Sequence, residues 1–126
     1  IQFAPPSDHE NHLKSMQKVD IALDSMPYTG GLTTIEALYM GVPVIGLAGR
    51  LLCHRHSTTH LSSTGHAELI AKTHADYVKK AVALATDQQR IVNYRRTLKD
   101  DVLESPLLGH KEFTEIFLKK MATLVS

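Results

Sequence analysis

Two apolar runs separated by a glycine-rich turn and a short helical segment constrain this chain more than any other feature. Residues 19–23 and 42–47 read as nearly continuous apolar strands, and residues 34–40 between them have helical character. Strands that are apolar on both faces are typical of a parallel sheet covered by helices on both sides. Residues 1–4 form a third apolar segment that ends at two prolines. The pattern predicts an α/β fold built on a parallel sheet.

The chain from residue 50 onward reads as helical. Thr73 with Asp76 and Thr86 with Gln89 have the spacing of capping boxes, which predicts that two helices begin at these threonines. We expect an apolar stripe on the last helix to pack in the core or at an interface. The stripe consists of Phe113, Ile116, Phe117, Met121 and Leu124. The expected helices are residues 8–18, 34–40, 55–63, 67–72, 73–85, 86–103 and 111–125.

The length of 126 residues indicates one domain, with an α/β part in residues 1–49 and a mostly helical part in residues 50–126. Three strands are few for such a sheet, and the chain begins abruptly in a strand-like segment. We therefore expect a fragment of a larger protein, preceded by further strand and helix units.

Composition narrows the classes of partner. The formal charge is +1 and the basic residues are scattered, so we expect neither a nucleic acid nor a membrane partner. Cys53 is the only cysteine, which excludes an intrachain disulfide and favours an intracellular, cytoplasmic setting. No apolar run approaches the roughly 18 residues that a membrane-spanning helix needs.

The segment with the most chemical information is the glycine-rich turn and the helix after it, DSMPYTGGLTTIEALYMG, residues 24–41. It follows the end of a predicted parallel strand, where open α/β sheets bind their ligands. Gly30 and Gly31 allow close backbone approach, and the amides of a helix start, with the hydroxyls of Thr33 and Thr34, suit an anion such as a pyrophosphate. No lysine follows, so this is not a Walker-type loop.

A second interpretation of the same residues needs no ligand. Thr33 and Glu36 also have the spacing of a capping box, in which Thr33 is the N-cap and Glu36 reaches back to the Thr33 amide. Glycine-rich turns between strand and helix also occur without any bound anion. On composition and spacing alone, both interpretations stay open.

Other polar residues invite weaker hypotheses. His56 and His60 in HRHSTTH are one helical turn apart, but no acidic ligand adjoins them, so we expect solvated or hydrogen-bonded histidines and no metal site. Cys53 lacks a positioned base and is interpreted as structural. Asp20 and Asp24 flank a strand and are interpreted as its polar ends.

The run VDIALDSMPYTGGLTTIEALYMGVPVIGLAG, residues 19–49, resembles the O-linked N-acetylglucosaminyltransferase family. More closely, it resembles the bacterial tetratricopeptide-repeat glycosyltransferases of that group and their plant relatives in the SPINDLY class. The resemblance continues at ELIA, residues 68–71, and SPL, residues 105–107. It implies two Rossmann-like lobes in the GT-B arrangement. This chain would be part of the C-terminal, nucleotide-sugar-binding lobe, a partial Rossmann-like sheet followed by a helical tail.

The resemblance also implies roles for individual residues. Thr33 and Thr34 match paired threonines that bind the diphosphate at a helix start. Glu36 matches an acidic residue that binds the ribose hydroxyls, and His12 matches a histidine that contacts the nucleotide. The backbone of Ser7 falls where the family's main chain meets the uracil.

Other positions lie beside the donor or depart from the family pattern. The resemblance places Tyr28 near the donor sugar. Leu32 replaces a histidine or threonine, so that one contact to phosphate or sugar would be made by main chain alone. His9 replaces a lysine that binds phosphate in some relatives, which puts the strength or pH dependence of that contact in doubt.

The function implied is inverting transfer of N-acetylglucosamine or another hexose from a uridine diphosphate (UDP) sugar to serine or threonine of a protein. The implied partners are the UDP-sugar, the protein acceptor and the N-terminal lobe. That lobe would hold the catalytic base, so no catalytic residue is expected in this chain. No cofactor or metal is expected, and the implied source is bacterial. A non-catalytic interaction module and a lobe of a sugar-nucleotide epimerase are the alternatives.

Overall fold

The computed structural model describes residues 3–125 and shows an α/β body with a three-stranded parallel sheet in the order β1–β2–β3. The strands are β1 (Ala22–Leu23), β2 (Val44–Leu47) and β3 (Ile70–Ala71). In the parallel register, Ala22, Leu23, Gly46 and Leu47 pair with Val44, Ile45, Ile70 and Ala71. The predicted α/β class with a parallel sheet is confirmed.

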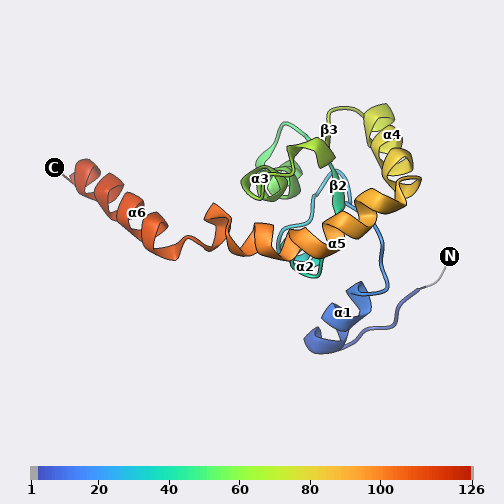
Figure 1. The fold of residues 1–126 in the computed structure, drawn as a ribbon. Coiled ribbons are helices and arrows are strands. Elements are labelled where there is room, and N and C mark those ends of the chain that lie inside the picture. The colour runs from blue at the N-terminus through green and yellow to red at the C-terminus, as the bar shows by residue number, and fades with distance from the viewer. Residues whose placement is uncertain (1–2, 126) are drawn as a thin grey trace.

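Helices occupy most of the remaining chain. The α-helices are α1 (His9–Met16), α2 (Leu32–Tyr39), α3 (His56–Ser63), α4 (His74–Ala85), α5 (Gln88–Leu103) and α6 (His110–Val125). Short 3₁₀ helices are η1 (Leu52–His54), η2 (Ala67–Leu69) and η3 (Pro106–Leu108). In Figure 1 the chain runs from α1 below the body to α6, which extends away from it at the other end.

Capping side chains fix the starts of three helices. Asp8 accepts a hydrogen bond from the Asn11 amide at the start of α1, and that bond holds the pKa of Asp8 below its usual value. Thr73 caps α4, as predicted. The cap of α5 is Asp87, whose carboxylate accepts from the Arg90 amide, and the prediction of Thr86 as its cap was wrong. An aspartate one residue later provides the same acceptor next to the helix start.

The predicted strand at residues 1–4 is not part of the sheet in the described chain. Ile1 and Gln2 lie outside the described residues, and Phe3 and Ala4 belong to no strand. The third strand is β3, in a segment that was predicted as helix 67–72. Its pattern was too short to separate strand from helix, and pairing with β2 decided it. The Ala48 amide donates to the Ala71 carbonyl at 2.9 Å, so β2 supplies the partner that β3 needs.

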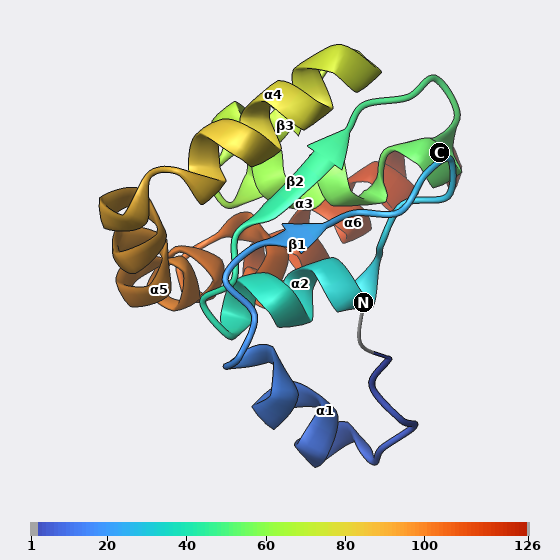
Figure 2. The ribbon, with the colours of Figure 1, turned by 90° about the vertical axis from the view of Figure 1, so that its right-hand side faces the viewer.

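Helices cover the sheet on two sides, as Figure 2 shows with α4 above the strands and α2 below them. Two successive crossovers, β1–α2–β2 and β2–α3–β3, bring α2 and α3 into contact. α4 packs on β2 and β3, and α5 packs against both α2 and α4. The most deeply buried apolar side chains are Leu38, Val42, Ile45, Leu61, Ala71, Leu84, Leu98 and Val102.

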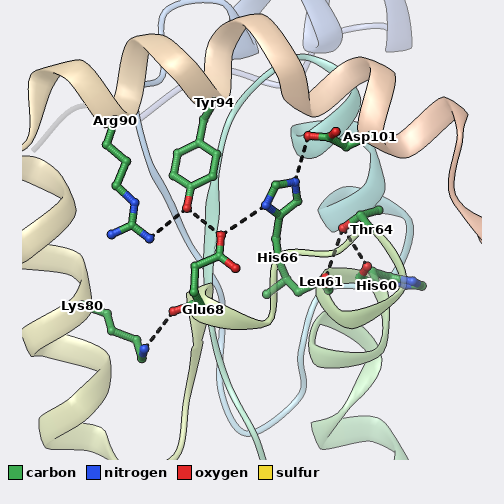
Figure 3. Close-up of polar contacts among 9 residues, drawn as sticks. All are labelled: His60, Leu61, Thr64, His66, Glu68, Lys80, Arg90, Tyr94 and Asp101. Carbon is green, nitrogen blue, oxygen red and sulfur yellow. Dashed lines mark hydrogen bonds and ion pairs between the residues drawn. The ribbon is translucent and has the colours of Figure 1, made fainter.

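A polar network fastens α5 to η2 (Figure 3). The hydroxyl of Tyr94 donates to Glu68 at 2.7 Å and accepts from Arg90 at 3.0 Å. One ring nitrogen of His66 lies 3.2 Å from Glu68, and the other lies 3.0 Å from Asp101. Burial and the hydrogen bond to Glu68 raise the pKa of Tyr94 to about 12. The network ties the helical part of the chain to the end of the sheet.

The final helix, α6, takes no part in the core of the described chain. Its side chains from residue 110 to 124 are all exposed, including the predicted apolar stripe. Phe113 and Phe117 stack on each other with their ring centroids 6.0 Å apart. No helix in the described part of the chain is long and apolar enough to cross a membrane.

Candidate functional site

The start of α2 presents open backbone donors. Its N-cap is Gly31, and no side chain caps the helix. The Thr34 amide bonds to the Gly31 carbonyl at 3.1 Å, whereas nothing in residues 3–125 accepts from the amides of Gly31, Leu32 or Thr33. Unpaired amides at a helix start, together with the positive end of the helix dipole, form an anion site.

The predicted capping box does not form. α2 begins at Leu32, so Thr33 already lies in the first helical turn, and the N-cap is Gly31. Glu36 does not reach back toward Thr33, because its carboxylate is engaged by a histidine of α1. Of the two interpretations of this segment, the one based on a capping box was therefore wrong.

The two threonines have different environments. Thr33 is exposed, and its hydroxyl makes no hydrogen bond to any described residue. Thr34 is buried, and its hydroxyl donates to the Gly30 carbonyl at 3.0 Å. The geometry makes Thr33 available to a ligand and commits the Thr34 hydroxyl to the loop before the helix.

Three side-chain oxygens lie close to Gly30. Its amide donates to Oδ1 of Asp24 at 2.8 Å, so this amide is not open to a ligand. A Cβ at this position would lie 2.6 Å from Oγ1 of Thr34, 2.9 Å from Oγ1 of Thr33 and 3.1 Å from Oδ1 of Asp24. Only glycine allows this approach, and of the two glycines only Gly31 has a free amide.

Glu36 meets the two predicted histidines of α1. Nε2 of His9 lies 2.7 Å from Oε1 of Glu36, and Nε2 of His12 lies 3.9 Å from Oε2. The Glu36 side chain is 12% exposed, whereas the His9 side chain is 70% exposed. The structure therefore brings together three residues that are up to 27 positions apart in the sequence.

The other predicted site residues stay apart from this cluster. Ser7 is exposed and precedes the cap of α1, and Leu32 is exposed at the start of α2. Tyr28 is exposed, and the edge of its ring meets the His56 ring with centroids 5.8 Å apart. His56 was not predicted as a neighbour of Tyr28, and nothing in the local sequence signals this contact.

Sequence reasoning missed two further residues beside the site. Asp24 was interpreted as a polar strand end, and Tyr77 was not singled out. The Tyr77 hydroxyl donates to the Asp24 carbonyl at 3.0 Å across 53 positions of sequence. A chain-wide contact of this kind has no local sequence pattern.

Two hollows lie near the carboxyl ends of β1 and β2. The smaller, about 250 Å³, contains the predicted residues Gly30, Thr33 and Thr34. The larger, about 450 Å³, lies beyond β2 and β3. It is lined by Met26, Pro27, Leu47, Ala48, Gly49, His54, Lys72, Thr73 and His74. We place the candidate site at the smaller hollow, because Thr33, which has an open amide and a free hydroxyl, lines it.

The described histidines and acids do not converge as metal ligands. Within residues 3–125, no group of three or more His, Cys, Asp or Glu side chains is arranged to hold a metal ion. Burial lowers the pKa of His60, and the neighbouring His56 lowers it further.

Comparison with known proteins gives consistent matches. Residues 1–117 match the model of glycosyl transferase family 41. A probable UDP-N-acetylglucosamine–peptide N-acetylglucosaminyltransferase SPINDLY from Eustoma exaltatum subsp. russellianum is 39% identical over 107 residues, which cover 85% of this chain and 12% of that protein. A UDP-N-acetylglucosamine–peptide N-acetylglucosaminyltransferase from Caenorhabditis elegans is 34% identical over 113 residues, 90% of this chain and 10% of that protein.

A solved structure supports the same relationship. A mutant of Thermobaculum terrenum O-GlcNAc transferase matches with a TM-score of 0.74 and 33% identity, over 77% of this chain and 19% of that chain. This chain thus spans about a tenth of the length of the curated relatives it matches. The family match covers almost the whole sequence and includes the turn and helix that form the candidate site, so the chain belongs to glycosyl transferase family 41.

Proposed function

We propose that this chain binds the diphosphate and ribose of a UDP-sugar donor as part of a glycosyltransferase that modifies serine or threonine of proteins. The observation that carries the proposal is the set of three open amides at the start of α2, beside the free Thr33 hydroxyl. The names of the relatives, which describe transfer of N-acetylglucosamine from its UDP derivative to peptides, support the choice of donor and acceptor.

The diphosphate would bind at the amides of Gly31, Leu32 and Thr33. Charged oxygens accept strong hydrogen bonds from such amides, and the dipole of α2 adds a favourable potential. Leu32 can contribute only its amide, because its side chain is apolar. Thr34 would support the site indirectly by holding the carbonyl of Gly30.

The ribose would bind at Glu36. A carboxylate can accept hydrogen bonds from two vicinal hydroxyls. No residue among 3–125 hydrogen-bonds to Oε2 of Glu36, and Nε2 of His12 lies 3.9 Å from it. His9 holds the other oxygen at 2.7 Å and so orients the group. His12 and the backbone near Ser7 would contact the base, and Tyr28 would lie near the sugar.

Within this proposal the chain assists the departure of UDP. In an inverting displacement, negative charge develops on the leaving diphosphate, and preorganised amides stabilise that charge. The step needs no metal if these donors supply the stabilisation. The catalytic base and the acceptor groove are assigned to the N-terminal lobe that the family possesses.

A titration with UDP, followed by amide chemical shifts, tests the proposal. We expect saturable shifts at Gly31, Leu32, Thr33 and Glu36, and smaller shifts at His12. The full-length protein is titrated in parallel, because the N-terminal lobe can add contacts. A folded full-length protein that shows no UDP binding would overturn the proposal and favour a non-catalytic interaction module.

Analysis of the reaction products tests the remaining alternative, a lobe of a sugar-nucleotide epimerase. A protein glycosyltransferase transfers radiolabelled sugar from the UDP-sugar to a protein, whereas a sugar-nucleotide epimerase returns a changed free sugar or nucleotide sugar. Detection of the second product in place of the first would refute the transferase assignment while leaving UDP binding intact.

A further inference from the structure

We propose that Asp24 and Tyr77 are positioning residues that hold the loop between β1 and α2 in its anion-binding conformation. The inference rests on the proposed function, since it concerns how the same site is held. Neither residue lies among the open donors themselves. Both act on the loop, residues 24–31, that delivers those donors.

Asp24 fixes the loop from inside. Its Oδ1 accepts from the Gly30 amide, six residues later, at 2.8 Å, and so closes the loop on itself. The Gly30 carbonyl is held from the other side by the Thr34 hydroxyl. With both polar groups of Gly30 committed, the next three amides are the ones left without an acceptor among residues 3–125.

The second carboxylate oxygen of Asp24 lies in an environment that does not stabilise it. This oxygen, Oδ2, is buried and has no hydrogen-bond partner among residues 3–125. A buried acceptor without a donor costs free energy, and a carboxylate near a bound diphosphate adds repulsion. The positioning role accounts for this cost, because Oδ1 of Asp24 accepts from the Gly30 amide and so holds the loop in the conformation that leaves the donors open.

Tyr77 holds the same loop from a separate element. It lies on α4, and its hydroxyl donates to the Asp24 carbonyl at 3.0 Å. Burial raises the pKa of Tyr77, and the charge of Asp24 raises it further, so the hydroxyl remains a donor at neutral pH. Because α4 packs on β2 and β3, this bond ties the loop to the rigid part of the sheet.

A second anchor shows that the loop is held at both ends. The Thr29 amide donates to the Cys53 carbonyl at 3.0 Å, and the Thr29 hydroxyl accepts from the His56 amide at 3.0 Å. Asp24 and Thr29 thus fix the two sides of the turn. Release of the Asp24 side should let the turn and the start of α2 move relative to a bound diphosphate.

The test compares UDP affinity and thermal stability of four variants in the full-length protein. Tyr77→Phe removes one hydroxyl and keeps the ring, and we expect the Kd for UDP to rise about threefold to tenfold. Asp24→Ala should weaken binding at least as much. Asp24→Asn retains an acceptor for the Gly30 amide, and we expect it to keep the Kd within about twofold of wild type.

Tyr94→Phe is the matched control. It removes a tyrosine hydroxyl that bonds to Glu68 rather than to the loop, so it should lower the melting temperature without changing the Kd for UDP. A purely structural role for Tyr77 would give the same pattern as this control. Amide shifts of Gly31, Leu32 and Thr33 in the ligand-free state should move in Tyr77→Phe and stay in place in Tyr94→Phe.

The outcomes distinguish the two proposals. If wild type binds UDP and both Tyr77→Phe and Asp24→Ala bind it equally well, the positioning role is refuted and the proposed function stands. If folded wild type does not bind UDP, the proposed function fails and the positioning role fails with it. Equal loss of affinity in Asp24→Asn and Asp24→Ala would contradict the role assigned to the acceptor.

Discussion

At the scale of single residues, adjacent side chains in the first turn of α2 perform different tasks. Thr33 is exposed with a free hydroxyl, whereas Thr34 is buried and bonds to the Gly30 carbonyl. The helical turn causes the difference, since neighbouring residues point about 100° apart around the axis. A pair that looks equivalent in the sequence therefore divides into an exposed hydroxyl, which the proposed function assigns to the ligand, and a loop support.

Substitution of each threonine tests this division. Thr33→Ala should raise the Kd for UDP roughly threefold to tenfold and leave the melting temperature unchanged, because it removes a hydroxyl that bonds to no described residue. Thr34→Val should lower the free energy of unfolding by about 1 kcal/mol, since the Gly30 carbonyl loses its donor. Calorimetric titration and urea unfolding measure the two effects. Identical profiles for the two variants would contradict the division.

Gly30 offers a second prediction at this scale. Gly30→Ala places a Cβ 2.6 Å from Oγ1 of Thr34, so the loop must shift, and we expect the free energy of unfolding to fall by about 1–3 kcal/mol. UDP binding should weaken as well, because the displaced threonines border the open amides. Gly109→Ala is the control, since its nearest neighbour would be 3.4 Å away. If Gly30→Ala behaves like wild type, the side chains around position 30 can accommodate a Cβ, and the prediction is wrong.

At the scale of elements, α5 depends on a partly buried polar network as well as on apolar packing. Ile91, Tyr94, Leu98 and Val102 form its buried face. Tyr94, Glu68, His66 and Asp101 bond α5 to η2, as Figure 3 shows. Ionisable groups in this network make the stability of the fold depend on pH.

In the alkaline range, the dependence of stability on pH follows from Tyr94. Its pKa is raised to about 12 in the folded chain, against about 10 when unfolded, so the unfolded state loses its proton first. Stability should fall as pH rises above 10, by on the order of 2 kcal/mol once pH 12 is reached. Urea unfolding of wild type and Tyr94→Phe between pH 8 and 11 measures how the free energy of unfolding depends on pH. The stability difference between them should shrink with rising pH, and a constant difference would contradict the assignment.

In the acid range, Glu68 makes the stability of the fold depend on pH with the opposite sign. Burial raises the pKa of Glu68, but hydrogen bonds from Tyr94, from its own backbone amide and from His66 outweigh burial and hold the pKa below 4.5. The stability that these bonds contribute is present above pH 4.5 and is lost as pH falls through the folded pKa. Unfolding of Glu68→Gln should therefore be less sensitive to pH below 4.5 than unfolding of wild type.

At the scale of the whole molecule, the body and α6 are nearly independent. All described side chains of α6 are exposed, and Figure 1 shows the helix extending away from the sheet. Its stripe of Phe113, Ile116, Phe117, Met121 and Leu124 stays uncovered by this chain. The core, in contrast, closes around β2 between α2, α3 and α4.

Removal of residues 110–126 tests that independence. Because the described part of α6 buries no side chain against the body, we expect the shortened chain to keep its melting temperature within about 2 °C. Circular dichroism should report less helix but an unchanged cooperative transition. A large drop in melting temperature would mean that α6 packs on the body in solution.

Much of this molecule could be predicted from local patterns. Apolar runs at residues 19–23 and 42–47 indicated two parallel strands, and Thr73 with Asp76 indicated the start of α4. The resemblance in residues 19–49 indicated the family. The glycine turn before α2 was predicted as an anion site, and three amides at the start of α2 have no acceptor among residues 3–125.

The errors came from short segments and from competition between partners. Residues 70–71 were predicted as helix, since two residues carry no periodicity that could show otherwise. Glu36 was interpreted both as a cap for its own helix and as a ribose ligand, and His9 of α1 competed for it in the structure. Local spacing cannot rank a nearby amide against a histidine 27 residues away.

The sequence by itself determined the fold class, the family and the position of the candidate site, because each depends on patterns within a few dozen residues. Tertiary structure decided which amides are free, which threonine faces outward, and that Tyr77 holds the loop from α4. These outcomes depend on how separate elements meet in space. Hydrogen-bond geometry across 53 residues is set by packing of the sheet and helices, and no local pattern encodes it.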